Sequence, residues 1–213
     1  MNLPNRITTA RIIASLGLFA FLAWTDTCAG PEWWPPLVAG SVFIIVVATD
    51  ALDGHYARKL GQITDFGRIA DPVADKLALS GSFIFLTSTD WAQPWLPTWV
   101  VVLIVGREFL VTGLRGFVEA RGVAFPSRMD GKVKMVVQCV AIPTLFAWRM
   151  LTNGADMGWD GPAIPVLIDV AEFLTLLAVW LGLGLALTSG GRYVVAAAQV
   201  LQTEAASSEK EGT

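Results

Sequence analysis

Cysteine, histidine and charged residues are all scarce in this chain of 213 residues. The two cysteines, Cys28 and Cys139, are too few for a disulfide framework, and we expect each to remain a thiol. The single histidine, His55, excludes a histidine-rich metal site. Charged residues make up only 15% of the chain against 54% hydrophobic residues, which is too apolar for an ordinary soluble domain. We expect no cleavable signal peptide in the N-terminal run.

Long apolar runs recur along the chain, and each is long enough to cross a bilayer as a helix, which takes about 20 residues. They predict an all-α, polytopic membrane protein with about six transmembrane helices. We expect one membrane domain over residues 1–202, with a short interfacial helix at Arg192–Gln202, and a polar, disordered tail over 203–213. The expected spans are Ile7–Trp24, Leu37–Arg58, Gly67–Thr87, Thr98–Val118, Lys132–Leu151 and Ala163–Thr188.

The basic residues are distributed unevenly between the two ends of these spans. All lysines and arginines except Arg149 fall on one side of the six-span arrangement. Because cytoplasmic loops carry the excess of lysine and arginine, that side is predicted to be cytoplasmic, with both termini on it. The chain is thus expected in the cytoplasmic (inner) membrane as a multi-pass protein.

One stretch, residues 50–75, concentrates carboxylates beside these apolar runs. Asp50 and Asp53 share one side of a predicted helix, and Asp71 and Asp75 share one side of the next. A short loop between the helices would point both pairs at one place. Packed carboxylates need compensation to stay ionised, and hard oxygen ligands favour Mg²⁺, Mn²⁺ or Ca²⁺ over zinc.

Basic and small residues near this stretch fit the same interpretation. Basic side chains can donate charge-assisted hydrogen bonds to phosphate oxygens. They can equally mark only the cytoplasmic boundary of the membrane, and this is the interpretation that we favour for Arg121 and Arg128. Small residues let a flat group, or simply a neighbouring helix, approach the backbone closely. The bases are Arg58, Arg107, Arg115, Lys132 and Lys134, and the small residues are Gly54, Ala57 and Gly67.

Eight residues at fixed spacings form a single motif, Asp50-x2-Asp53-Gly54-x2-Ala57-Arg58-x8-Gly67-x3-Asp71-x3-Asp75. This motif is similar, position for position, to the signature of the CDP-alcohol phosphotransferase family. The resemblance implies six transmembrane helices with a cytoplasm-facing polar cavity. It also implies transfer of a substituted phosphate from a CDP-linked lipid to an alcohol, with release of CMP.

The resemblance also implies a role for each residue of the motif. Asp75 would be the catalytic base that takes the proton from the attacking hydroxyl. A pair of divalent ions, Mg²⁺ or Mn²⁺, would neutralise the diphosphate. The implied metal ligands are Asp50, Asp53, Asp71 and Asp75, and the implied CDP-lipid contacts are Gly54, Ala57 and Gly67 with the cytidine and Arg58 with the diphosphate.

Segments outside the motif indicate the acceptor. The opening run at residues 2–11, the run at 71–76 and the basic motifs near 106 and 131 are similar to family members that use CDP-diacylglycerol and sn-glycerol 3-phosphate. An acceptor that carries its own phosphate needs a cationic pocket, for which Arg107, Arg115, Lys132 and Lys134 are the candidates. The resemblance implies a homodimer among membrane lipids, and no nucleic-acid partner is expected.

Three alternatives stay open. The same chemistry can serve another acceptor, namely inositol phosphate, serine or phosphatidylglycerol. A membrane prenyltransferase also uses aspartate pairs and Mg²⁺ on a diphosphate, but lacks the Gly-Ala-Arg spacing. A divalent-cation transporter would also use an acidic intramembrane site, but it leaves the arginines unexplained.

Overall fold

The computed structural model describes the backbone of residues 3–27, 31–60, 65–121 and 129–211. Of these, the side chains of 3, 4, 6, 26, 27, 50–60, 65–72, 75, 129–132 and 203–211 are left out of the description. The described residues form six helices and no strand, which confirms the all-α prediction. The helices are α1 (Leu3–Thr27), α2 (Trp34–Leu60), α3 (Asp65–Thr87), α4 (Thr98–Glu119), α5 (Met129–Asp156) and α6 (Ile164–Glu211).

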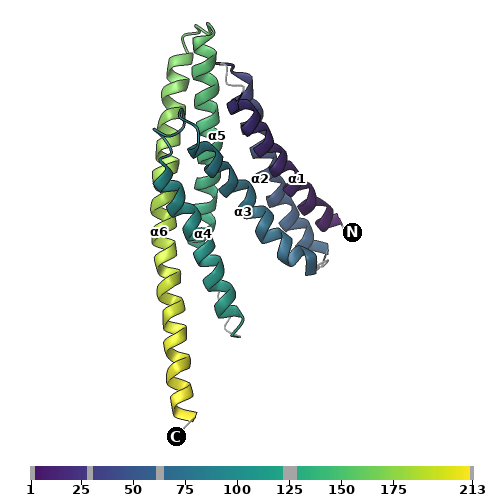
Figure 1. Ribbon diagram of the computed structural model, residues 1–213, viewed down its shortest axis with the longest axis vertical. Helices are drawn as coiled ribbons and strands as arrows, with labels where there is room; N and C mark the ends of the chain where they lie inside the picture. The colour runs from purple at the N-terminus through teal and green to yellow at the C-terminus, as the bar shows by residue number, and fades with distance from the viewer. Residues whose placement is uncertain (1–2, 28–30, 61–64, 122–128, 212–213) are drawn as a thin grey trace.

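Consecutive helices run in alternating directions, so that the chain enters and leaves the bundle away from the α5–α6 turn (Figure 1). α5 lies along α6, and α4 packs against the lower part of α6. On the other side of the bundle α1 packs against α2 and α3, and α2 also packs against α5. This arrangement places the end of α2 and the beginning of α3 at the same end of the bundle.

A single apolar core runs through the bundle and receives side chains from every helix. Proline falls in the first turns of α1 and α2, where a missing N–H removes no helical hydrogen bond. Close packing of aromatic and branched side chains then holds the helices at fixed separations. The buried members of the core include Leu18, Phe43, Phe83, Ile104, Phe146 and Leu183.

The outer surface is also apolar, as a lipid-facing surface must be. Large hydrophobic side chains such as Ile13 and Phe173 are each 64% exposed, on α1 and α6 respectively. By length and composition, three described segments suffice to span a membrane: Ile7–Thr25, Val133–Asp156 and Ile164–Gln202. The apolar parts of α2 and α3 within the described side chains are shorter, Trp34–Thr49 and Lys76–Thr87, and α4 carries charges in its middle. The prediction of a polytopic helical membrane protein is confirmed.

The last helix is longer than the sequence indicates. The predicted separate helix at Arg192–Gln202 is wrong, because α6 runs without interruption from Ile164 to Glu211. The Ser189-Gly190-Gly191 run does not end the helix, and Arg107 of α4 donates hydrogen bonds just before it and at its start, to the Ala186 carbonyl and the Ser189 hydroxyl. The helical bounds enter the stretch 203–213, for which disorder in solution stays a prediction.

Candidate active site

The motif residues occupy two adjoining helix ends. Asp50, Asp53, Gly54, Ala57 and Arg58 lie in the last turns of α2, and Gly67, Asp71 and Asp75 lie in the first turns of α3. Their side chains lie outside the description, so the predicted meeting of the four carboxylates stays a prediction. Among the described side chains there is no group of three histidine, cysteine or acidic residues that could hold a metal ion.

The donor set nevertheless fits the predicted ions chemically. Asp71 and Asp75 are one helical turn apart, and Asp50 and Asp53 are about one turn apart on the preceding helix. Carboxylate oxygens from two neighbouring helix ends are the hard ligands that Mg²⁺ and Mn²⁺ prefer.

Two predicted acceptor contacts, Arg107 and Lys134, meet a third ionisable residue, Glu108, in a largely buried cluster between α4, α5 and α6. Arg107 Nη1 lies 3.0 Å from Glu108 Oε1, and Lys134 Nζ of α5 forms an ion pair with the same oxygen. The side chains of Arg107, Glu108 and Lys134 are only 9%, 16% and 5% exposed. We call these three residues the α4–α5 charge cluster.

Arg107 also ties the cluster to α6. Its Nε donates to the Ala186 carbonyl at 3.1 Å, and its Nη2 donates to Ser189 Oγ at 2.8 Å. Ser189 Oγ in turn donates to the Leu185 carbonyl at 2.6 Å. The guanidinium is therefore held by partners from its own helix and from α6, which fixes its position.

Within this cluster two bases share one carboxylate oxygen. Arg107 and Lys134 both contact Glu108 Oε1, so a cation of α4 and a cation of α5 are held close together. Guanidinium and ammonium groups are the donors that form charge-assisted hydrogen bonds to phosphate oxygens. The role of these two bases in the acceptor pocket stays a prediction.

Arg115, another predicted acceptor contact, is not part of this cluster. Arg115 Nε forms an ion pair at 2.8 Å with Glu119 Oε1 one turn further along α4, and the two side chains are 47% and 46% exposed. The side chain of Lys132 lies outside the description. Both residues stay predictions for the acceptor pocket, whereas Arg107 and Lys134 are brought together.

Sequence reasoning missed Glu108 and Ser189 as members of the site. Glu108 had a visible signal, since an acidic residue within an apolar run needs a charged partner. Ser189 had none, because a serine in an apolar helix ordinarily bonds to its own backbone. Arg11 of α1 is also a buried base, with only 5% of its surface exposed. Cys139 is a thiol, as predicted, and Cys28 lies outside the described residues.

Known proteins resemble this chain over most of its length. The family described as CDP-alcohol phosphatidyltransferase matches residues 1–187. A Bacillus subtilis (strain 168) protein named CDP-diacylglycerol–glycerol-3-phosphate 3-phosphatidyltransferase is 37% identical over 185 residues, covering 84% of this chain and 92% of the relative. A protein of the same name from Cereibacter sphaeroides is 30% identical over 197 residues, covering 86% of each. A probable phosphatidylglycerophosphate synthase of Mycobacterium tuberculosis (strain H37Rv) is 38% identical over 141 residues, covering 66% of this chain and 64% of the relative.

Proposed function

This chain belongs to the CDP-alcohol phosphatidyltransferase family, and from that premise we propose that it transfers the phosphatidyl group of CDP-diacylglycerol to sn-glycerol 3-phosphate. The products are phosphatidylglycerophosphate and CMP. Relatives named for this reaction support the choice, at 37% and 30% identity over more than four fifths of the chain.

The chemistry requires little covalent work from the protein. The free hydroxyl oxygen of glycerol 3-phosphate attacks the phosphorus of the phosphatidyl group. The bond from that phosphorus to the bridging diphosphate oxygen breaks, and CMP leaves with that oxygen. We assign the hydroxyl proton to the carboxylate of Asp75, so proton and charge balance within the site. Divalent ions held by Asp50, Asp53, Asp71 and Asp75 supply neutralisation of the diphosphate charge.

The other motif residues position the nucleotide. We assign Gly54, Ala57 and Gly67 to contact with the cytidine, because their small side chains leave room for a flat ring near the backbone. We assign Arg58 to the diphosphate, where a guanidinium forms paired bonds to phosphate oxygens. Holding both reactants at short range supplies much of the rate enhancement in such a displacement.

The observation that carries the choice of acceptor is the meeting of two largely buried bases, Arg107 and Lys134, in the α4–α5 charge cluster. Serine has no phosphate and needs no buried cation, so the cluster argues against it. The phosphate of inositol phosphate could bind the same two bases, but none of the three relatives described above is named for a reaction with it. We therefore place the phosphate of the acceptor beside Arg107 and Lys134, with Lys132 and Arg115 as further contacts.

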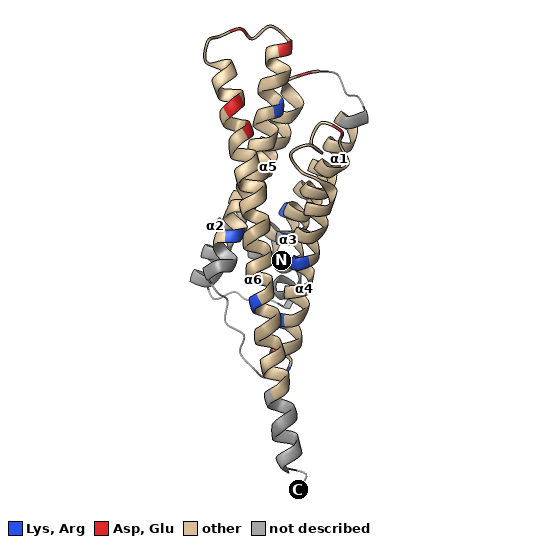
Figure 2. Ribbon diagram, turned by 90° about the vertical axis from the view of Figure 1, so that its left-hand side faces the viewer, with Lys and Arg blue, Asp and Glu red and all other residues tan. Residues whose placement is uncertain are grey.

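We also propose that the protein is a homodimer with its active site and both termini on the cytoplasmic side of the cell membrane. The basic residues support this orientation, because among the described side chains all but one arginine lie away from the α5–α6 turn, where acidic residues gather (Figure 2). The dimer rests on resemblance to the family. Crosslinking in native membranes tests it, and a monomer at all protein concentrations would contradict it.

The proposed function is tested by CMP release from CDP-diacylglycerol with purified protein. We expect release only when glycerol 3-phosphate is present with Mg²⁺ or Mn²⁺, and none in EDTA. The same assay with inositol phosphate, serine and phosphatidylglycerol identifies the acceptor. Release with one of these and not with glycerol 3-phosphate would overturn the choice, and ion flux in proteoliposomes without CMP release would favour a transporter.

A further inference from the structure

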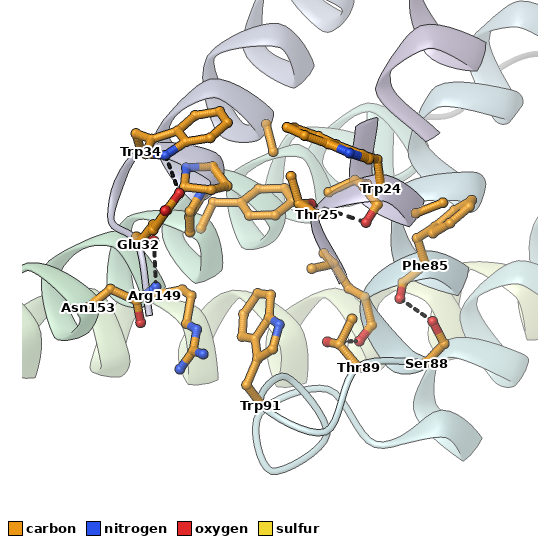
Figure 3. Close-up of a pocket in the computed structure, with 17 residues that line it drawn as sticks. Trp24, Thr25, Glu32, Trp34, Phe85, Ser88, Thr89, Trp91, Arg149 and Asn153 are labelled. Carbon is orange, nitrogen blue, oxygen red and sulfur yellow. Dashed lines mark hydrogen bonds between the residues drawn. The ribbon is translucent and has the colours of Figure 1, made fainter. Parts of the chain in front are cut away.

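Figure 3 shows a cavity, which has a volume of about 580 Å³. It is formed by α1, α2, the end of α3 with the turn that follows, and α5. Arg149, a basic residue of its lining, comes fifteen residues after Lys134 of the charge cluster on α5, which is about 22 Å along a helix. The volume falls in the range of small-molecule sites, roughly 300–1,000 Å³. Of the residues assigned to the transfer reaction, none whose side chain is described lines it.

The walls of the cavity are aromatic and apolar. Trp24 and Trp34 line one side of it, and Trp91 lies opposite, with Phe85 and Phe146 contributing from α3 and α5. Tryptophan gathers at the level of lipid headgroups, where one edge meets water and the rest meets hydrocarbon. The walls therefore suit a molecule with an apolar body rather than a small hydrophilic ion.

Two opposite charges line the same cavity without pairing with each other. The guanidinium of Arg149 lies 5.3 Å from the ring centre of Trp91 and has no described carboxylate within ion-pair distance. Asp156, two turns further along α5, contributes only a longer-range favourable interaction. Since Arg149 forms no hydrogen bond to a described residue, its N–H donors are available to an occupant.

Glu32 is held close to the same turn of α5. Asn153, one turn after Arg149, donates a hydrogen bond of 2.7 Å to the Glu32 backbone carbonyl. The Glu32 carboxylate accepts a hydrogen bond from Trp34 Nε1. The other hydroxyls of the lining donate to carbonyls of their own segments, namely Thr25 to Leu22, Ser88 to Phe85 and Thr89 to Leu86.

We propose that this cavity binds one phospholipid with a zwitterionic, amine-bearing headgroup. Its phosphate is bound by Arg149, and its ammonium lies between the Glu32 carboxylate and the faces of Trp24 and Trp34. Its glycerol group and the upper parts of its acyl chains fill the cavity and contact the aromatic side chains of its walls. An anionic lipid would satisfy Arg149 but would bring a second negative charge towards Glu32. Among the described residues that line the cavity there are one base and one acid, which favours a headgroup of zero net charge.

Lipid binding to the purified full chain in detergent, measured by native mass spectrometry, tests the proposal. We expect dioleoylphosphatidylethanolamine to bind as one retained molecule, about tenfold more tightly than dioleoylphosphatidylglycerol, the effect of about one charge-assisted bond. Glycerophosphoethanolamine, which has the headgroup but no chains, is expected to bind far more weakly. Equal binding of the two lipids, or of the soluble headgroup and the lipid, would overturn the assignment.

Charge variants locate the site. Arg149→Gln is expected to weaken phosphatidylethanolamine binding about tenfold, and Glu32→Gln to abolish the preference over phosphatidylglycerol. Arg121→Gln and Asp160→Asn remove the same charges outside the cavity and are expected to change neither value. Ser88→Trp fills the cavity with both charges intact, and is expected to lose the retained lipid even if Arg149→Gln does not fold. Unchanged binding in both Glu32→Gln and Ser88→Trp would refute the site, whatever the transferase activity shows.

Discussion

Gly190 of α6 lies directly against the side chain of Arg107 on α4. A β-carbon at Gly190 would come within 2.9 Å of Arg107 Cγ and 3.4 Å of Nε, closer than an unstrained contact allows. The absence of a side chain at Gly190 therefore lets Arg107 lie flat on α6 and reach the Ala186 carbonyl. A glycine in one helix thus sets the position of a phosphate-binding candidate in another.

Gly190→Ala is expected to displace Arg107 and raise the KM for glycerol 3-phosphate about tenfold, the effect of about one hydrogen bond to a charged group. The measurement is CMP release as a function of glycerol 3-phosphate at saturating CDP-diacylglycerol. Gly191→Ala is the matched control, because a β-carbon there has no neighbouring atom within 4 Å. That variant gains helix propensity without a clash, so it is expected to keep the KM and to be slightly more stable. The same KM in both variants would contradict the role of this contact.

Glu108→Gln is expected to destabilise the protein by about 3–5 kcal/mol, because it removes a largely buried carboxylate that forms ion pairs with both Arg107 and Lys134. Thermal unfolding of the purified protein in detergent measures the change. Adding Lys134→Met to this variant removes one of the two bases that Glu108 had paired with and is expected to restore part of the stability.

Glu119→Gln serves as the control for that experiment. It removes the same charge from α4, but its ion pair with Arg115 is nearly half exposed and is expected to contribute less than about 1 kcal/mol. Equal destabilisation by the Glu108 and Glu119 substitutions would show that the buried cluster does not stabilise the bundle.

The sequence was sufficient to predict the helices but not the end of the last one. Apolar runs set the spans because each must bury its backbone polar groups in a helix to cross a bilayer. The last span was predicted to end at Thr188, but the Ser189–Gly191 run that follows is helical. Arg107, 79 residues earlier in the chain than its acceptor Ala186, bonds to α6 beside this run. A contact between residues so far apart leaves no local pattern in the sequence.

The charge cluster was predictable only in part. Arg107 and Lys134 stood out as bases in or near apolar runs, but their shared partner depends on how α4 and α5 are rotated against each other. From the eight-residue spacing, we expected Arg115 on the same face of the helix as Arg107. At 100° per residue, however, the two side chains are about 80° apart around the helix. In the structure this rotation turns Arg115 towards Glu119 and solvent, while Arg107 faces α6.

Asp75→Asn is expected to lower kcat by about 10²–10⁴-fold while largely sparing binding of CDP-diacylglycerol, because a metal ligand and the base are lost together. CMP release and nucleotide-lipid binding are measured on the same preparation. Asp90→Asn, in the exposed turn after α3, removes an equal charge from outside the motif and is expected to be silent. Unchanged CMP release by the Asp75 variant would remove it from the proposed role.

Arg115→Ala separates a contact with the acceptor from a surface ion pair. We expect Arg115→Ala to raise the KM for glycerol 3-phosphate far more than the KM for CDP-diacylglycerol, because Arg115 would bind the acceptor phosphate. Glu119→Ala removes the same ion pair but keeps the base, and it frees Arg115 to meet the acceptor, so the KM should stay constant or fall. An equal effect of Arg115→Ala on both KM values would place Arg115 outside the acceptor pocket. Arg107 and Lys134 would then have to bind the phosphate without it.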